Sequence, residues 1–426
     1  MTAKGRASAV FTILAAAVLL WPALWNGYPL VFSDTGTYLS QAIEHHAGWD
    51  RPIFYSLFLL PLHLTLTTWP AIAVQALLTA YVLHLVHRTL LPDVSAWWLL
   101  PIAAAMTIAT ALPWFVSQLM PDVFTGLLVL VLALLMFAPD RLTRNERVWL
   151  MALAAFMIAV HQSHLLLAVV LLLMAIPLRR GLARVAAPLG LAMIALLSVN
   201  LTVFDRASLA PFSNVFLLAR VIYDGPGMHV LRRDCPAAGW RLCAVIDQFP
   251  TSSDDFLWRS DGPVAQAGGA KVVSLEADAI IAAALRHEPW VELRAAMANT
   301  ADQLCRFGTG DGLDASPITV TSTIERDFPS SEAATYAASL QANGQLEVPA
   351  PLRVLHAIVA LAGVVGCCVL LLAPQRQLRN LAAAALVAVL ANAAITGALS
   401  GPHDRYQSRI MWLPPLVATL GLAAKR

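Results

Sequence analysis

Apolar runs nearly as long as a lipid bilayer is thick recur through this chain, and they constrain its fold more than any other feature. A membrane-spanning helix takes about 20 apolar residues to cross roughly 30 Å of hydrocarbon. The runs are 8–27, 69–87, 96–114, 122–138, 148–160, 164–178, 185–204, 353–373, 381–399 and 410–424. The two short runs, 148–160 and 164–178, form either a tight helical hairpin or one broken element. The pattern predicts an all-α protein with about ten transmembrane helices.

Composition excludes most soluble classes of protein. Of the 426 residues, 58% are hydrophobic and only 13% are charged, whereas an average soluble protein carries roughly 25% charged residues. Too few polar groups remain to cover a water-facing surface, which excludes an ordinary cytosolic enzyme and a disordered protein. The net charge of +2 provides no basic field for DNA or RNA, so a nucleic-acid partner is not expected.

The charged residues are unevenly distributed, and this divides the chain. Residues 205–352 hold 18 acidic and 11 basic residues, whereas the other 278 residues have a net charge of +9. One acidic, water-soluble insertion therefore interrupts the membrane part. The predicted organisation is an N-terminal membrane module at 1–204 with a first outer loop at 28–68, a soluble and mostly helical domain at 205–352, and C-terminal membrane helices at 353–426.

Basic residues in the short loops predict the orientation, because cytoplasmic loops carry an excess of Lys and Arg. Only four would lie on the outer side: Arg51, Arg353, Arg405 and Arg409. Thirteen would lie inside: Lys4, Arg6, Arg88, Arg141, Arg144, Arg147, Arg179, Arg180, Arg184, Arg376, Arg379, Lys425 and Arg426. We expect a multi-pass protein of the inner (plasma) membrane. Both termini would be cytoplasmic, and the domain at 205–352 would be periplasmic or otherwise extracytoplasmic. The first run lacks an A-x-A-like cleavage site and is expected to remain as a helix.

The insertion contains two nearby cysteines and several short elements. Cys235 and Cys243 bracket a short loop, and in an oxidising compartment they either form a disulfide or remain as two thiols. Helix-like composition covers 206–233, 273–305 and 331–343. The β-branched residues from Ile318 to Thr323 predict one strand.

Several polar residues gather at the predicted outer face. They are Asp34, Glu44, Asp50, Asp122 and Asp404, together with Arg51, Arg405, Arg409, His45, His46 and His403. Any one of them can simply be solvated at the membrane border. Because so many share one face, they indicate a polar, outward-facing site close to the lipid.

The first outer loop predicts two amphipathic helices at the membrane surface. Ser33 or Asp34 would cap the first, and the second would follow a turn at 48–52. Asp34 then lies near the mouth of the bundle, where it serves either as a helix cap or as a catalytic carboxylate.

The same loop resembles the GT-C glycosyltransferases, integral membrane enzymes that use polyprenyl-phosphate sugars, including the aminoarabinose transferases and protein O-mannosyltransferases. That superfamily has a motif like D-E-x-x-Y-x-x-x-A followed by one like H/R-P-P-L-Y-Y. The matching residues here are Asp34, Tyr38 and Ala42, then Arg51, Pro52 and Tyr55. The chain departs from the motifs at Thr35, where a second acid is frequent, and at Ile53, where a second Pro is frequent.

Two further elements, both far along the chain, are similar to GT-C motifs. Met120-Pro121-Asp122 resembles the acidic element of the second outer loop. His403-Asp404-Arg405-Tyr406 before Leu413-Pro414-Pro415-Leu416 resembles the R-Y…L-P-P element before the last membrane helix. The resemblance covers 8–204 and 353–424 and leaves out the insertion.

The resemblance implies an inverting transfer of sugar from a polyprenyl-phosphate donor to a glycan, lipid or protein acceptor at the extracytoplasmic face. Asp34 would act as base or orient the acceptor, with Asp122 supporting it. Arg405, with Arg409, His403 and Arg51, would hold the donor phosphate. Tyr38 and Tyr55 would contact substrate. The resemblance leaves open a divalent cation (Mg²⁺ or Mn²⁺), for which Asp34 and Asp122 would be the ligands.

His161 and His164 occupy a short polar turn between two predicted spans. They are either solvated turn residues, contacts to phosphate or sugar, or two ligands of a metal ion. Two other classes of function are compatible with the chain. A secondary transporter would place charges at mid-depth of broken helices, often in two repeated halves, and neither feature is visible. A non-catalytic protein of cell-envelope assembly is the other alternative.

Overall fold

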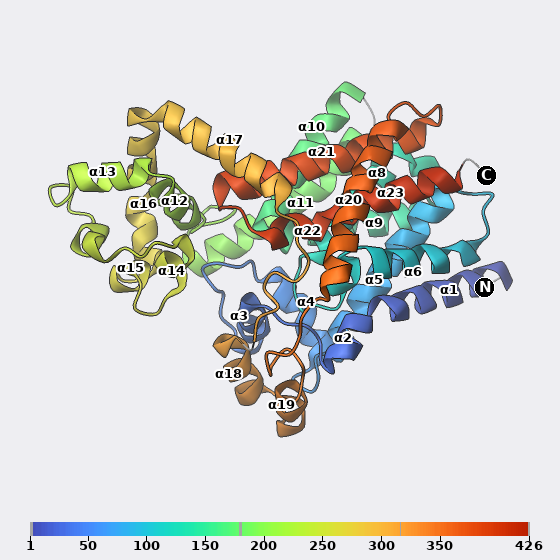
Figure 1. Cartoon of the computed structure of the whole chain (residues 1–426), viewed down its shortest axis with the longest axis horizontal. Helices are drawn as coiled ribbons and strands as arrows, with labels where there is room; N and C mark the ends of the chain where they lie inside the picture. The colour runs from blue at the N-terminus through green and yellow to red at the C-terminus, as the bar shows by residue number, and fades with distance from the viewer. Residues whose placement is uncertain (1–2, 179–180, 316, 425–426) are drawn as a thin grey trace. The chain divides into compact units, whose positions relative to one another are not determined.

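The computed structural model describes residues 3–178, 181–315 and 317–424, and over these ranges the chain is helical (Figure 1). The one β-type contact recorded among them is an isolated parallel bridge between Leu30 and Gln118. The predicted all-α class agrees with this architecture. Among the basic loop residues used above, Arg179, Arg180, Lys425, Arg426 and the side chain of Lys4 lie outside the described residues.

The helices before residue 205 are α1 (Ala3–Leu19), α2 (Trp21–Asn26), α3 (Ser33–Ile43), α4 (Phe54–His63), α5 (Trp69–Leu90), η1 (Ala96–Trp98), α6 (Leu99–Ala109), α7 (Leu112–Val116), α8 (Val123–Phe137), η2 (Pro139–Arg141), α9 (Arg144–Ala159), α10 (Gln162–Leu178) and α11 (Leu182–Phe204).

The helices that follow are α12 (Asn214–Tyr223), α13 (Pro226–Asp234), η3 (Arg241–Ala244), η4 (Ile246–Gln248), α14 (Ser253–Trp258), α15 (Pro263–Gln266), α16 (Ala270–His287), α17 (Pro289–Cys305), α18 (Ile318–Asp327), α19 (Ser330–Ala337), α20 (Ala350–Leu370), α21 (Arg376–Leu399), α22 (Asp404–Met411) and α23 (Leu413–Ala423).

Four of the described helices are long and apolar enough to cross a membrane: α5, α11, α20 and α21. This is fewer than the ten runs suggested. The other runs form shorter helices, and turn residues divide some of them between two helices. The run 96–114, for example, is split at Thr110 between α6 and α7, where Pro113 occupies the first turn of α7. The runs 148–160 and 164–178 correspond to two packed helices, α9 and α10, which is the hairpin alternative.

The chain divides into two compact units. The larger unit comprises residues 1–194, 306–392 and 404–426, and the smaller unit comprises 195–305 and 393–403. The insertion predicted at 205–352 is thus shared between them, since only its part up to Cys305 belongs to the smaller unit. The residues after Cys305 pack instead with the first outer loop.

In the larger unit, α1 packs along α5 and α6, and α20 packs on α23 (Figure 1). Main-chain hydrogen bonds join Leu30, in the loop predicted at 28–68, to the segment that precedes α8. Leu30 donates its N–H to Ser117 O at 2.9 Å, and Leu119 donates its N–H to Leu30 O at 2.8 Å. These bonds place the start of the first outer loop beside the approach to α8.

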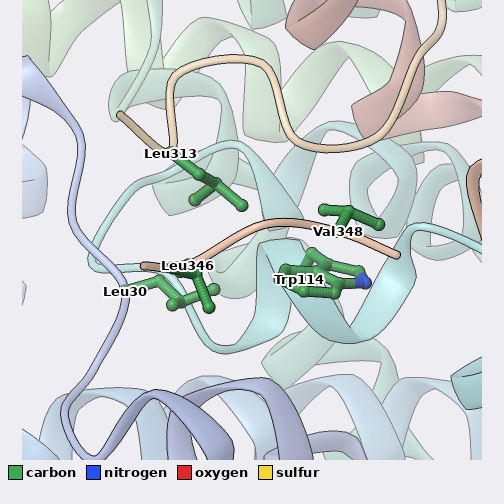
Figure 2. Close-up of a cluster of buried hydrophobic side chains, with 5 residues drawn as sticks. All are labelled: Leu30, Trp114, Leu313, Leu346 and Val348. Carbon is green, nitrogen blue, oxygen red and sulfur yellow. The ribbon is translucent and has the colours of Figure 1, made fainter. Parts of the chain in front are cut away.

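The segment from 306 to 349, which we call the return segment, covers this junction. Its residues Leu313, Leu346 and Val348 form an apolar cluster with Leu30 and Trp114 (Figure 2). Its Gln341 side chain accepts from Val31 N–H at 3.0 Å and donates to Val31 O at 2.8 Å. The return segment therefore holds the first outer loop by both apolar and polar contacts.

The strand predicted from Ile318 to Thr323 is wrong, because these residues form the first part of α18. Val320, Thr323 and Ile324 are its buried residues, a spacing that matches one helical face. This face packs on α3, where a Cβ added at Gly36 would lie 2.6 Å from Thr319 O. Tertiary packing thus overrides the β propensity of the β-branched residues.

The smaller unit is built around α12, α13 and α16, which pack on one another. Arg220 of α12 is buried and pairs with Glu292 of α17 at 2.7 Å and with Asp224 at 2.8 Å. Cys235 and Cys243 are joined by a disulfide with their Cα atoms 5.4 Å apart. This unit therefore has its own buried ion pairs and its own covalent link.

Candidate functional site

Asp122 is the centre of a buried charge cluster in the larger unit. It immediately precedes α8 and is fully buried. Its Oδ2 accepts from Arg405 Nη2 at 2.9 Å, and its Oδ1 accepts from Arg409 Nη1 at 3.0 Å. One carboxylate is therefore shared by two guanidinium groups that lie one turn apart on α22.

Asp34 forms the second carboxylate of this cluster. Arg51 donates to Asp34 Oδ2 from Nη2 at 2.7 Å and from Nε at 2.9 Å. Arg405 Nη2 lies 3.9 Å from the same oxygen, so Arg405 stands between Asp34 and Asp122. The cluster thus joins three segments that are distant in the chain: the first outer loop, the start of α8 and α22.

Asp34 does not act as a helix cap. The N-cap position of α3 is Phe32, and Asp34 lies in the first turn without a capping hydrogen bond. Thr35 supplies the cap instead, because its Oγ1 accepts from Phe32 N–H at 2.9 Å and donates to Leu119 O at 3.1 Å. Thr35, the position at which the chain departs from the acidic GT-C motif, therefore orders the loop through these two hydrogen bonds.

Arg409 is held from several sides and is fully buried. Besides Asp122, its Nη2 donates to Ser163 Oγ at 3.0 Å and to Asn392 Oδ1 at 3.3 Å. His161 Nε2 lies 3.5 Å from Arg409 Nη1. Burial, and then the nearby Arg409 charge, lower the pKa of His161 well below its usual range. His161 is therefore neutral near pH 7.

His164 is occupied by two contacts that fix its tautomer. Met157 O can only accept, so His164 Nδ1 donates to it at 2.7 Å. His164 Nε2 then accepts from Thr125 Oγ1 at 2.7 Å. Both ring nitrogens are used, so His164 links α10 to α8 and α9 and is not available as a metal ligand in this arrangement.

The glycine-containing start of the return segment positions α22. Asp311 Oδ2 accepts from Arg405 N–H at 2.8 Å, and Asp404 Oδ1 accepts from Gly308 N–H at 2.7 Å. Gly312 has φ +77°, and a Cβ there would meet the Phe32 ring at 2.1 Å. Phe32 in turn lies 3.7 Å below the Arg405 guanidinium. This packing fixes the direction of the Arg405 side chain.

Tyr38 and Tyr55 line the buried side of the first outer loop. Both are fully buried, and their rings meet edge to face at 5.0 Å. Tyr55 donates its hydroxyl to Gln75 Oε1. The Tyr38 hydroxyl is buried with no hydrogen-bond partner among the described residues. Burial raises the pKa of Tyr38 well above its usual value, so this hydroxyl is a neutral donor facing a charged cluster.

His403 is the one predicted phosphate-binding residue in the smaller unit. Its N–H donates to Gln303 Oε1 at 3.0 Å, and its Nε2 lies 4.0 Å from Asp254 Oδ2. The other residues proposed from the resemblance lie in the larger unit. Contacts join Asp34, Asp122, Arg51, Arg405 and Arg409 directly.

Sequence reasoning missed three residues that shape the cluster: Phe32, Asn392 and Asp311. Asn392 alone carried a usable signal, since a buried amide inside an apolar run of 381–399 needs a partner. Asp311 lies about 90 residues before the helix that it caps, and no local pattern could join them.

Among the groups of the cluster that pair directly, the guanidinium groups outnumber the carboxylates by one. Three guanidinium groups face two carboxylates, Asp34 and Asp122, and the neighbouring Asp50 is buried beside Arg51. Burial is the largest influence on Asp50 and raises its pKa. The donor set suits an anion better than a divalent cation, because both carboxylates already pair with arginines. No group of three His, Cys, Asp or Glu residues that could hold a metal occurs among the described residues.

Comparisons of this chain with protein-family models, with curated proteins and with solved structures gave no match.

Proposed function

We propose that this protein is a polytopic membrane glycosyltransferase of the GT-C type, which moves a sugar from a polyprenyl-phosphate donor to an acceptor at the extracytoplasmic face. The observation that carries the proposal is the buried cluster of Asp34, Arg51, Asp122, Arg405 and Arg409. In this proposal about ten helical elements lie in the membrane, the short ones as paired or broken spans. Helices α3 and α4 lie at its outer surface.

The arginines of the cluster suit the leaving group of such a reaction. A polyprenyl phosphate gains negative charge as its bond to the sugar breaks, and fixed cations stabilise that charge most when they are placed beforehand. Arg405 is held by Asp122, by Phe32 and through its own N–H by Asp311. Its geometry is therefore set without the substrate, and Arg51 and Arg409 flank it.

The two carboxylates have different roles in this proposal. Asp122 has both oxygens engaged by arginines and is fully buried, so it positions Arg405 and Arg409. Asp34 Oδ1 accepts no hydrogen bond from the residues that the structure describes, and 11% of the Asp34 side chain is exposed. Asp34 therefore takes the proton of the acceptor hydroxyl, or orients that hydroxyl, as the anomeric carbon becomes oxocarbenium-like.

Donor binding tests the proposal directly. Native mass spectrometry of the purified protein with a polyprenyl phosphate should show a specific complex in the wild type. Arg405→Ala should weaken it about 10- to 100-fold, because charge-assisted hydrogen bonds contribute about 1.5–3 kcal/mol. Arg405→Lys should restore only part of the affinity, because the planar fork is lost.

Arg147→Ala is the matched control, since Arg147 belongs to a predicted cytoplasmic loop. Equal donor affinity in the wild type and in Arg405→Ala would remove Arg405 from the site. Uptake of a soluble solute by proteoliposomes, without polyprenyl-phosphate binding, would favour a secondary transporter instead.

A further inference from the structure

Helix α17 of the smaller unit turns a polar face inward and exposes large apolar side chains. An amphipathic helix of a soluble domain does the opposite. The buried positions of α17 carry polar side chains, Glu292 and Gln303, which are 3% and 0% exposed, and the partly buried Asn299 lies on the same side of the helix. Its exposed positions carry large apolar side chains: Trp290 is 78% exposed, and Met297 is 64% exposed. In water the exposed apolar residues would be unfavourable, because burial of such side chains contributes about 1.5–3 kcal/mol each.

The polar face of α17 is fully engaged inside the smaller unit. Glu292 pairs with Arg220 at 2.7 Å, and Asn299 Nδ2 donates to Asp224 Oδ2 at 3.0 Å. Gln303 exchanges hydrogen bonds with the backbone of His403 at 2.8 and 3.0 Å. The helix therefore cannot rotate to hide its apolar face without breaking buried ion pairs and hydrogen bonds.

The apolar residues form one continuous stripe. Trp290, Leu293, Met297, Ala301 and Leu304 follow one another at intervals of three or four residues, which places them on one side of a helix. All of them are exposed except Leu304, which is partly exposed. Arg294 lies beside the stripe, where its long side chain can reach a phosphate headgroup.

The position of α17 indicates what covers the stripe. A Cβ added at Gly397 would lie 2.6 Å from Asn299 O, so α17 packs against the side of the last turn of α21. Figure 1 shows α17 passing beside that end of α21. Helix α21 is one of the four helices long enough to span a membrane, so its last turn lies near the membrane border. A helix packed on that turn shares the same depth.

We propose that the stripe on α17 lies in the outer interface of the bilayer, where it anchors the smaller unit to lipid. Trp290 then lies among the headgroups, as tryptophans of membrane proteins commonly do. The last turn of α21, on which α17 packs, also exposes an apolar side chain, Leu399, which is 41% exposed; an apolar surface beside the end of a candidate span is why lipid, and not a protein partner, is the occupant. The inference rests on the proposed membrane insertion of α21 and does not depend on the transferase reaction.

Site-specific fluorescence tests this proposal in the full-length protein in nanodiscs. Free Cys305, Cys367 and Cys368 are replaced by Ala, and an environment-sensitive NBD label is placed at Met297→Cys. The label should be quenched by brominated lipid and be several-fold less sensitive to aqueous iodide than the same label at Ala298→Cys. Ala298 is the matched control, because it is exposed on the same helix but outside the stripe.

A label at Leu390→Cys in α21 provides the lipid reference, since Leu390 is 56% exposed inside a candidate span. If position 390 is quenched by lipid while 297 and 298 are equally quenched by iodide, the anchor is overturned and the membrane insertion stands. If 390 is quenched only by iodide, the insertion itself fails. If 297 is protected from both quenchers, a protein covers the stripe, and the lipid assignment is wrong.

Discussion

The two compact units each bury an ion-pair network. The networks differ in the ratio of guanidinium groups to carboxylates and in how far apart in the chain their partners lie. In the smaller unit, the guanidinium of Arg220 on α12 pairs with two carboxylates. They are Asp224, at the C-terminal end of α12, and Glu292 of α17. In the larger unit, three guanidinium groups meet two carboxylates from segments far apart in the chain. In the smaller unit the paired carboxylates outnumber the guanidinium group, so no anion is needed there. In the larger unit the guanidinium groups outnumber the carboxylates that pair with them directly, which favours an anion. We infer that the first network stabilises the fold and the second binds a ligand.

The largest expected effect comes from Asp122, because it compensates two buried arginines at once. Asp122→Ala should lower the free energy of unfolding by about 3–5 kcal/mol, the usual result of leaving buried charge uncompensated. Thermal unfolding in detergent measures this. Asp140→Asn is the control, because Asp140 is exposed. A stability equal to that of the wild type would show that water or lipid solvates these arginines.

Asp34→Asn separates catalysis from structure in the same network. Asparagine still accepts a hydrogen bond from Arg51 but cannot take a proton. Turnover with a polyprenyl-phosphate sugar should therefore fall on the order of 10²-fold or more, while donor binding and unfolding change little. Glu44→Gln is the control, as an exposed acid of the same loop that pairs with Arg326. Normal turnover in Asp34→Asn would contradict the catalytic role and shift attention to Asp122.

Glu292→Gln tests whether the smaller unit's network is only structural. Arg220 would lose one of its charged partners, which should lower the free energy of unfolding by about 1–3 kcal/mol. Turnover per folded molecule should stay the same. Glu288→Gln is the control, because Glu288 lies four residues before Glu292 and pairs with the exposed His229. A selective loss of turnover at unchanged stability would show that this network also serves the reaction.

The smallest effect is expected at Asp311, which acts on Arg405 through its backbone. Asp311→Ala removes a hydrogen bond at the start of α22, worth about 1 kcal/mol, and should raise the KM for donor several-fold with little change in kcat. Asp311→Asn retains an acceptor oxygen and should restore most of the donor affinity. Asp314→Ala, an exposed acid of the same loop, should have no effect. An unchanged KM in Asp311→Ala would mean that Phe32 alone orients Arg405.

Local pattern predicted the helical class and the helix that begins at Ser33, whereas the outer position of the polar residues stays a prediction. Local pattern also selected Asp34, Arg51, Asp122, Arg405 and Arg409, since charged residues at the ends of apolar runs are costly and therefore informative. The pattern was wrong for α18, where β-branched residues favoured a strand, and it did not anticipate that turn residues divide some apolar runs between two helices. Those outcomes depend on which neighbours a segment meets.

Only the tertiary structure decided how the selected residues are paired. Spacing along the chain could not show that Asp122 is shared by two arginines, that Thr35 replaces Asp34 as the cap, or that Asp311 holds the start of α22. Each of these contacts joins residues from 84 to 287 positions apart or competes with a local alternative. Hydrophobic periodicity reports the face that a helix buries, but Coulomb and hydrogen-bond energies depend on distances of a few ångströms between partners. Those distances exist only once the chain has folded.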